Sequence, residues 1–418
     1  MTKLTIQAIS YISLILSPII AVSGLSVSFL FPMIAATIIL LNYQSINIKT
    51  IFNNQIIWLF PAIIIVFCYL SPEDVLPFQL ATKTLITYFL AIILTLLLKN
   101  KKTAITSKTL AHNSFNYHTI FLYLSYGYLI AIFTLLFIQT IDPDILSILG
   151  KKIYNINFNT EEYLILKINR QLCIFALLYL LVTIFFYNNK QKFLAFITYI
   201  ITALTIFISH SETAKLVFII TNIIFIFTYY LNYKFRYLLV ISYFLINLIA
   251  ITIIPNLNIQ KIAENTNLQH SAIHRLCIWQ YTINLIKQNP FGYGFNSSSD
   301  LLHTSIKDKQ TCVSPNKQTT TVMETIKYHI SLHPHYNILQ ILLELGLAGL
   351  FFLGLLFLKT EYFLKETCSK KLSIAVSYSV LLGYLTIGST GYDIWQSWYF
   401  SYLFLIAFYN FILIKKII

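Results

Sequence analysis

Residues 118–138 read HTIFLYLSYGYLIAIFTLLFI, a stretch of 21 residues without Asp, Glu, Lys or Arg. A helix of about 20 apolar residues crosses the roughly 30 Å hydrocarbon core of a bilayer. The stretch therefore predicts a transmembrane helix. The whole chain agrees with it, since 57% of its 418 residues are hydrophobic, 11% are charged and the mean hydropathy is +0.72. These values exclude an ordinary soluble domain.

Apolar runs of similar length recur along the whole chain. Including the first, they centre on residues 5–22, 25–41, 55–70, 76–98, 118–138, 163–186, 193–209, 214–231, 236–254, 337–358, 372–390 and 395–414. We predict an all-α integral membrane protein with about 12 transmembrane helices, forming a single polytopic domain over residues 1–418. The first run has no small-residue cleavage site followed by polar sequence, so we interpret it as an uncleaved span.

The net charge of +14 comes from lysines that cluster in alternate loops, a distribution that does not predict a nucleic-acid partner. By the positive-inside rule these loops, and both termini with Lys3 and Lys416, are cytoplasmic. The opposite loops are short or acidic, except for one of about 80 residues at 255–335. We predict that residues 255–335 form one large loop on the external side.

Ionisable residues gather at the external ends of the predicted spans, where burial is costly and a function is often the reason. They are Lys167 and Arg170, the turn with Glu212 and Lys215, Arg275 in the large loop, and His333, His335 and Glu344. Each has a simpler structural explanation. The basic side chains of Lys167 and Arg170 can snorkel to the interface, Glu212 and Lys215 can form a local (i, i+3) ion pair, and a single histidine is more often structural.

The large loop has a helical pattern of its own. Apolar residues recur at three and four spacing from Leu268 to Gln288, which predicts an amphipathic helix against the membrane, with Arg275 and Trp279 as neighbours on it. Asn289-Pro290 ends this helix, and Gly292 and Gly294 allow a close turn. Without a strand before it, Gly-x-Gly does not predict a dinucleotide site. Cys277 and Cys312 share this loop, so a disulfide between them is possible.

The tenth predicted span begins in SLHPHYNILQILLELGLAG, residues 331–349. We expect Pro334 to open the helix, with His335 in its first turn. Asn337, Gln340 and Glu344 then form a polar stripe that requires a wet cavity or a polar partner.

These residues resemble the O-antigen ligase and polymerase superfamily of bacterial membrane proteins. The resemblance rests on HRLCIWQYTINLIKQNPFGYGF, residues 274–295, followed about 40 residues later by HPHYNILQILLELGLAG. The family pattern is filled by Arg275, Trp279, Pro290, Gly292, Gly294, His333, His335, Glu344, Gly346 and Gly349. Similar but shorter matches are INRQL around Arg170, SETAKL at 211–216 and IWQSW at 394–398. Two departures are Tyr336, where relatives have Asn, and Glu212, where many have a cation.

The resemblance implies a glycosyltransferase of the bacterial inner membrane, with its active site facing the periplasm. It implies a donor glycan on undecaprenyl diphosphate, an acceptor on lipid A-core, and contact with membrane lipids. Arg275 would bind the diphosphate, because its planar guanidinium can hold two phosphate oxygens, supported by Arg170 and Lys215. His335 would be the general base, with His333, Glu344, Asn337, Trp279, Gly292 and Gly294 in supporting roles.

Direct attack by the acceptor would invert the anomeric centre. The large loop has no Asp-x-Asp motif, so we expect no metal and no cofactor. Other functions remain open: an O-antigen polymerase with the same donor, a protein-glycosylating oligosaccharyltransferase, or a non-enzymatic transporter of lipid-linked glycans. A transporter predicts charges near the midplane, whereas here they lie at the external ends. The single large loop, beside a short one at about 139–162, favours a ligase over a polymerase.

Overall fold

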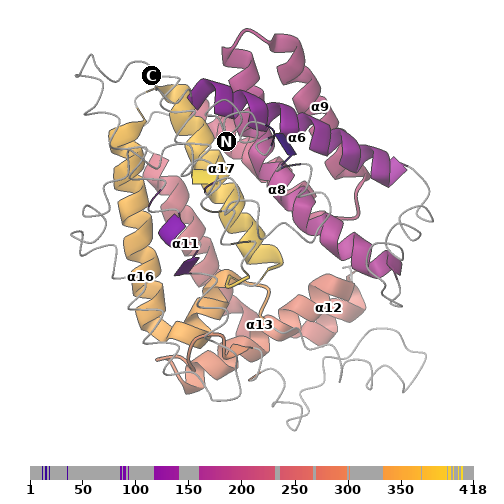
Figure 1. Cartoon of the computed structure of the whole chain (residues 1–418). Coiled ribbons are helices and arrows are strands. Elements are labelled where there is room, and N and C mark those ends of the chain that lie inside the picture. Colours follow the sequence, from indigo (N-terminus) through magenta and orange to yellow (C-terminus); the bar gives the residue numbers. More distant parts are fainter. Residues whose placement is uncertain are drawn as a thin grey trace.

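A computed structural model describes residues 117–140, 160–230, 236–266, 270–298, 301, 333–368, 370–392, 394–396, 399, 403, 406 and 407, with isolated positions between 12 and 93. The secondary structure elements of these residues are helices (Figure 1). They are α6 (Tyr117–Thr140), α8 (Thr160–Asn188), α9 (Lys192–Ile208), α10 (Glu212–Tyr230), α11 (Arg236–Ile253), the 3-10 helix η5 (Ile254–Asn256), α12 (Ile259–Asn265), α13 (His270–Gln288), α16 (Asn337–Thr367) and α17 (Lys371–Thr390).

Six helices in the described residues are long and apolar enough to cross a membrane: α6, α8, α10, α11, α16 and α17. Each coincides with a span predicted from the sequence, which confirms a multi-pass membrane protein. The predicted span at 193–209 corresponds to α9, which is apolar but has only 17 residues. The spans predicted at 5–22, 25–41, 55–70, 76–98 and 395–414 lie mostly outside the described residues.

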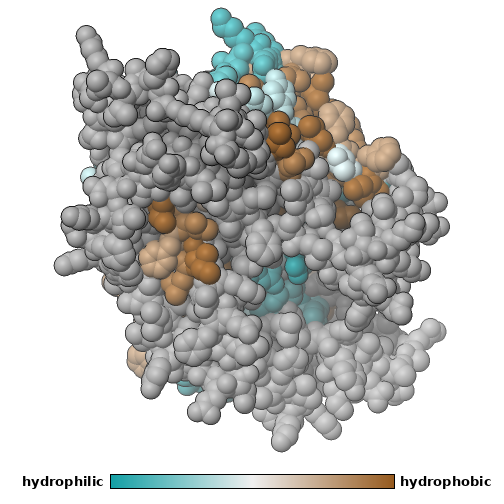
Figure 2. Space-filling model, viewed as in Figure 1, coloured by the Kyte–Doolittle hydropathy of each residue, from teal (hydrophilic) through white to brown (hydrophobic). Residues whose placement is uncertain are grey.

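The spans differ in how far protein surrounds them. In α8, 83% of the most apolar window is buried, against 11% in α11, so α8 lies inside the helix bundle and α11 at its edge. Large apolar side chains point outward from α6 and α9, among them Phe133, Phe137, Phe193, Phe196 and Phe207. Figure 2 shows apolar surface gathered at the upper right, where Figure 1 places these two helices. Outward apolar surface of this extent is what contact with lipid requires.

The core of the bundle joins α8, α10 and α17. A Cβ at Gly383 of α17 would lie 2.6 Å from Leu177 of α8 and 3.0 Å from Thr221 of α10, so these three helices approach closely at this glycine. Buried hydroxyls on the same helices bond to their own backbone, as Ser377 does to Ser373 O (2.7 Å) and Ser379 to Ala375 O (2.6 Å). Internal hydrogen bonds of this kind are needed where lipid offers none.

One end of the bundle collects the segments that the sequence singled out. In Figure 1, α13, the start of α16 and the end of α17 meet at the lower side of the molecule, beside the start of α8. Contacts between α13 and α16, between α16 and α17, and between α13 and η5 hold this arrangement. We refer to it below as the site end.

Candidate functional site

The site end depends on a break inside α16. Gly346 has φ 61° and ψ −157°, which interrupts the helix after Leu345. The turn after α13 fills the break: Tyr293 N–H donates to Leu343 O (2.9 Å), Gly294 N–H donates to Glu344 O (3.0 Å), and Leu347 N–H donates to Pro290 O (3.0 Å). Backbone groups that the break removes from the helix are therefore satisfied by the turn.

Glycine is required on both sides of this contact. Gly292 and Gly346 both have positive φ, and a Cβ at Gly292 would lie 2.5 Å from Glu344 O. A Cβ at Gly346 would lie 2.3 Å from the carbonyl carbon of Phe291. The two glycine motifs of the sequence, Gly-Tyr-Gly and Glu-x-Gly, therefore belong to one docking contact, and the structure gives Gly292 and Gly294 a backbone role.

Glu344 ties three segments together. Its side chain is fully buried and accepts hydrogen bonds from Gln340 Nε2 (3.0 Å), from Asn296 N–H (2.9 Å) and from Trp395 Nε1 (2.5 Å). Gln340 in turn accepts from the N–H of Ile394 (3.1 Å). The polar stripe on α16 thus meets polar partners, one of the two environments that the sequence predicted for it.

Asn337 begins the same stripe and contacts the segment after α17. Its side chain lies 3.0 Å from Gly388 O, 3.1 Å from Tyr392 O and 3.0 Å from the Tyr399 hydroxyl. Because the two carbonyl oxygens can only accept, the amide nitrogen faces them and the amide oxygen faces Tyr399. Asn337 thereby fixes the backbone that follows the last turn of α17.

The His-Pro-His segment lies outside the helix. We expected His335 in the first helical turn, and this is wrong: α16 begins at Asn337, and His335 has φ 54°. The left-handed conformation of His335 reverses the chain after Pro334, and Tyr336 then caps the helix with an extended backbone. Trp279 Nε1 of α13 holds this segment by donating to Pro334 O (2.9 Å).

Tyr336, which departs from the family pattern noted in the sequence, is anchored by two contacts. Its ring lies 5.1 Å from that of Trp279, and its hydroxyl donates to Asn247 Oδ1 of α11. The Tyr336 side chain is buried between α11 and α13. The side chain of its neighbour His335 instead faces Gly391, at the end of α17.

His335 is oriented by the residue that follows α17. Its Nδ1 lies 2.8 Å from Gly391 O. A carbonyl oxygen only accepts, so Nδ1 carries the proton in the neutral ring and Nε2 keeps its lone pair. The ring of His333 lies 4.3 Å away, between centroids.

The electrostatic surroundings keep both histidines neutral. The pKa of His333 and that of His335 are each lowered to about 4, chiefly by burial. The charge of Arg170 contributes to the lowering at His333, and the charge of Arg275 contributes at His335. Burial also lowers the pKa of Arg275, but a guanidinium stays charged in such surroundings. The structure thus brings together Arg170 from α8, Arg275 from α13 and both histidines. Figure 2 shows hydrophilic surface deep in the view, near the place where Figure 1 shows the end of α17.

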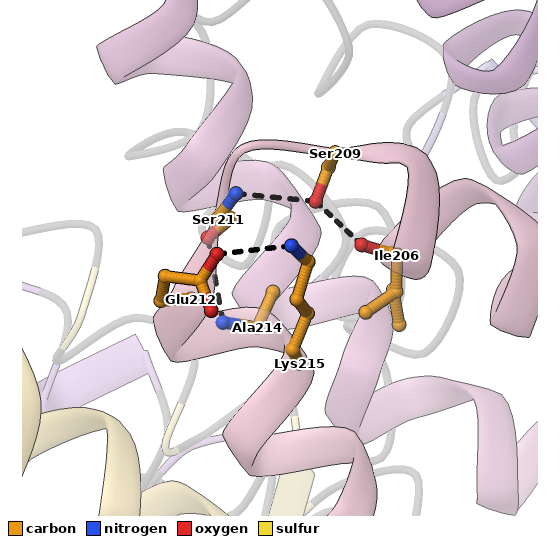
Figure 3. A network of polar contacts seen from close by, with 6 residues as sticks. All are labelled: Ile206, Ser209, Ser211, Glu212, Ala214 and Lys215. Carbon is orange, nitrogen blue, oxygen red and sulfur yellow. Dashed lines mark hydrogen bonds and ion pairs between the residues drawn. The ribbon is translucent and has the colours of Figure 1, made fainter.

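The serine-rich turn before α10 borders this cluster, but its cation has a partner (Figure 3). Lys215 Nζ lies 2.9 Å from Glu212 Oε1, the local ion pair that the spacing predicted. Ser211 Oγ caps α10 by accepting from Ala214 N–H (3.3 Å). A carboxylate this close offsets the charge of Lys215, so the two arginines are better placed than Lys215 to hold an anion. The side chain of Lys167 lies outside the described residues.

Sequence reasoning missed Gly391 and Tyr392, which supply the carbonyl for His335 and a phenol beside the arginines. Their only signal was a polar interruption, Gly-Tyr-Asp, between the last two apolar runs. Cys277 is disulfide-bonded, and Cys312, the possible partner named from the sequence, lies outside the described residues. Among the residues that the structure describes, no group of His, Cys, Asp and Glu is arranged to hold a metal ion.

Fold and site define a multi-pass membrane protein with arginines and neutral histidines at one end of its helices. Residues 197–354, from α9 through the broken part of α16, match the family described as O-antigen ligase. Over this region the chain is therefore similar to the O-antigen ligase family, as the sequence motifs indicated.

Several rickettsial proteins are similar to this chain. A protein of Rickettsia typhi named "Putative polysaccharide ligase" is 36% identical over 223 residues, which is 52% of this chain and 51% of the relative. Proteins of the same name from Rickettsia conorii (34% over 220 residues, 51% and 50%) and Rickettsia bellii (32% over 219 residues, 51% and 50%) are also similar. The chain thus spans about half the length of the curated relatives it matches.

Proposed function

We propose that the protein is a metal-independent, inverting glycosyltransferase that moves O-antigen polysaccharide from undecaprenyl diphosphate to lipid A-core. The observation that carries the proposal is the orientation of His335: Gly391 O accepts from its Nδ1–H, which makes Nε2 the basic nitrogen, and the charge of Arg275 acts on the same ring. The family match and the names of the rickettsial relatives support the substrate class.

The chemistry needs a group that binds a diphosphate and a group that accepts a proton. Arg275, supported by Arg170, binds the diphosphate of the donor and stabilises the charge that grows on it as the sugar leaves. His335 Nε2 takes the proton of the acceptor hydroxyl. The hydroxyl oxygen bonds to the anomeric carbon, the carbon–oxygen bond to the phosphate breaks, and the configuration inverts. No cofactor enters this scheme.

The membrane setting follows from the same substrates, since donor and acceptor are both lipid-tethered. We place the protein in the bacterial inner membrane as one domain over residues 1–418, with both termini cytoplasmic. Residues 255–335 then form the periplasmic loop within it. The disulfide of Cys277 supports this placement, because disulfides persist in the periplasm.

Two of the other functions left open are a polymerase that joins carrier-linked repeat units and a transporter of lipid-linked glycan. A strain lacking the gene separates them. We expect lipopolysaccharide without long glycan, and accumulation of polymerised carrier-linked material. Single repeat units on the core would instead indicate a polymerase, and carrier-linked material trapped on the cytoplasmic face would indicate a transporter.

The base is tested with the protein reconstituted in lipid with donor and acceptor. His335→Ala should abolish transfer while the variant inserts and folds like the native chain, because the variant lacks the imidazole that Gly391 O orients as the base. Retained transfer would refute the assignment. In the same assay a chelator should leave the native rate unchanged, and a loss reversed by divalent ions would refute metal independence.

A further inference from the structure

The two residues after α17 form a rigid unit at the site. The Tyr392 carbonyl accepts from Asn337 of α16 (3.1 Å), and the Gly391 carbonyl accepts from His335 (2.8 Å). Thr213 Oγ1 lies 3.5 Å from where a Cβ of Gly391 would be, so α10 borders the same unit. Backbone contacts with α16 and the histidine segment therefore fix where the Tyr392 side chain starts.

That side chain points toward α8. The Tyr392 hydroxyl lies 3.9 Å from Cys173 Sγ, which itself lies 4.0 Å from Ser211 Oγ. Cys173 follows Arg170 by three residues on α8, so the two occupy neighbouring positions on one face of the helix. The phenol is thus held at the turn of α8 from which Arg170 projects.

The charges of both arginines affect the pKa of the Tyr392 phenol. Burial raises the pKa of Tyr392 well above its usual value, while the charges of Arg170 and Arg275 lower it in part. The hydroxyl therefore keeps its proton at any physiological pH. A carboxylate near both arginines would neutralise them and repel a phosphate, whereas a neutral hydroxyl does neither and adds a donor.

We propose that Tyr392 is a further substrate-binding residue, whose hydroxyl donates a hydrogen bond to an anionic oxygen of a diphosphate held by Arg170 and Arg275. This inference rests on the proposed function, since it assumes that the arginines bind the diphosphate of the donor. The bond strengthens as charge grows on the leaving group, so Tyr392 contributes to the rate of transfer as well as to binding.

The test uses the full chain in lipid nanodiscs, inorganic pyrophosphate as the probe, and calorimetry for its affinity. Tyr392→Phe removes the hydroxyl and keeps the ring. We expect pyrophosphate affinity to fall about 10- to 100-fold, the usual effect of losing a hydrogen bond to a charged group. The transfer rate at saturating donor should fall too, with the melting temperature of the ligand-free protein unchanged.

Tyr128→Phe is the matched control, because that hydroxyl is also buried and bonded, to Phe175 O (3.0 Å) and Thr202 Oγ1 (2.9 Å), within the core. It should leave pyrophosphate affinity unchanged. Cys173→Ala is a second variant, which removes the contact between Cys173 Sγ and the Tyr392 hydroxyl and leaves the phenol itself unchanged. We expect pyrophosphate affinity to fall less in this variant, by about 2- to 5-fold.

The outcomes separate the two proposals. Native affinity in Tyr392→Phe, in a protein that transfers glycan, overturns the role of Tyr392 and leaves the proposed function intact. An equal loss in Tyr128→Phe overturns it as well, because the effect would then be structural. A native protein that neither binds pyrophosphate nor transfers glycan overturns the proposed function, and the role of Tyr392 with it.

Discussion

At the scale of the residue, the tautomer and charge of His335 determine how the reaction depends on pH. The ring must be neutral to act as a base, and its pKa in the free protein lies at about 4, below the ordinary 6.5. As pH falls, kcat/KM should therefore hold through 6.5 and be lost only as pH passes through about 4. Measuring kcat/KM between pH 4 and 8 checks this. An acidic limb near 6.5 would mean that His335 titrates as a solvated imidazole.

Arg275 is tested by a change that conserves its charge. Arg275→Lys replaces a planar fork by a point charge, so we expect kcat/KM to fall about 10-fold or more if the diphosphate is held by two hydrogen bonds. Arg170→Lys in the same assay shows whether the supporting cation needs this geometry too. Unimpaired transfer by Arg275→Lys would show that charge alone is sufficient.

The arginines and histidines of this cluster could be identified from the sequence. Burying ionisable groups near a membrane is unfavourable, so such residues are rare there and often functional. The sequence could not identify Gly391, whose contribution is a backbone carbonyl and leaves no side-chain signal. It also misplaced His335 in a helical turn, because a left-handed histidine is set by the contact of Pro334 with Trp279, a residue 55 positions away in the chain.

At the scale of the element, the break in α16 is the feature on which the site depends. Gly346→Ala would force a Cβ against the Phe291 backbone at positive φ, so we expect it to undock the turn at 290–294 and destabilise the protein by several kcal/mol. Gly354→Ala in the same helix is the control, because nothing described lies within 4 Å of its Cβ; it should be neutral or stabilising by about 0.5–1 kcal/mol. Thermal melting in detergent measures both, and equal effects would contradict the docking contact.

Hydropathy located the described spans well, since each is long and apolar. The break within α16 was invisible to it, because residues 337–358 have the length and the average hydropathy of one uninterrupted span. The two glycine motifs were visible, but only the fold shows that they belong to one contact, since about 50 residues separate Gly292 from Gly346.

At the scale of the whole molecule, the direction of each helix determines which loops share a side with the site. Arg170 lies near the start of the apolar part of α8, and that helix ends at Asn188, so the loop leading to Lys192 lies at the opposite end of the bundle. Phe291, which is 80% exposed, lies in the turn docked at the site end. The lysine distribution predicts that the loop with Lys192 is cytoplasmic, and the site end must then be periplasmic.

Cysteine labelling tests this arrangement directly. A membrane-impermeant maleimide, applied to cells with only the outer membrane opened, should label Phe291→Cys, whereas Lys192→Cys should react only after the inner membrane is permeabilised as well. The unsubstituted protein sets the background, to which the buried thiols Cys173 and Cys368 contribute little. The reverse pattern would place His335 and both arginines in the cytoplasm, where cytosolic reductants would also threaten the disulfide of Cys277. A periplasmic transfer reaction would then be impossible for this chain, however well its residues suit the chemistry.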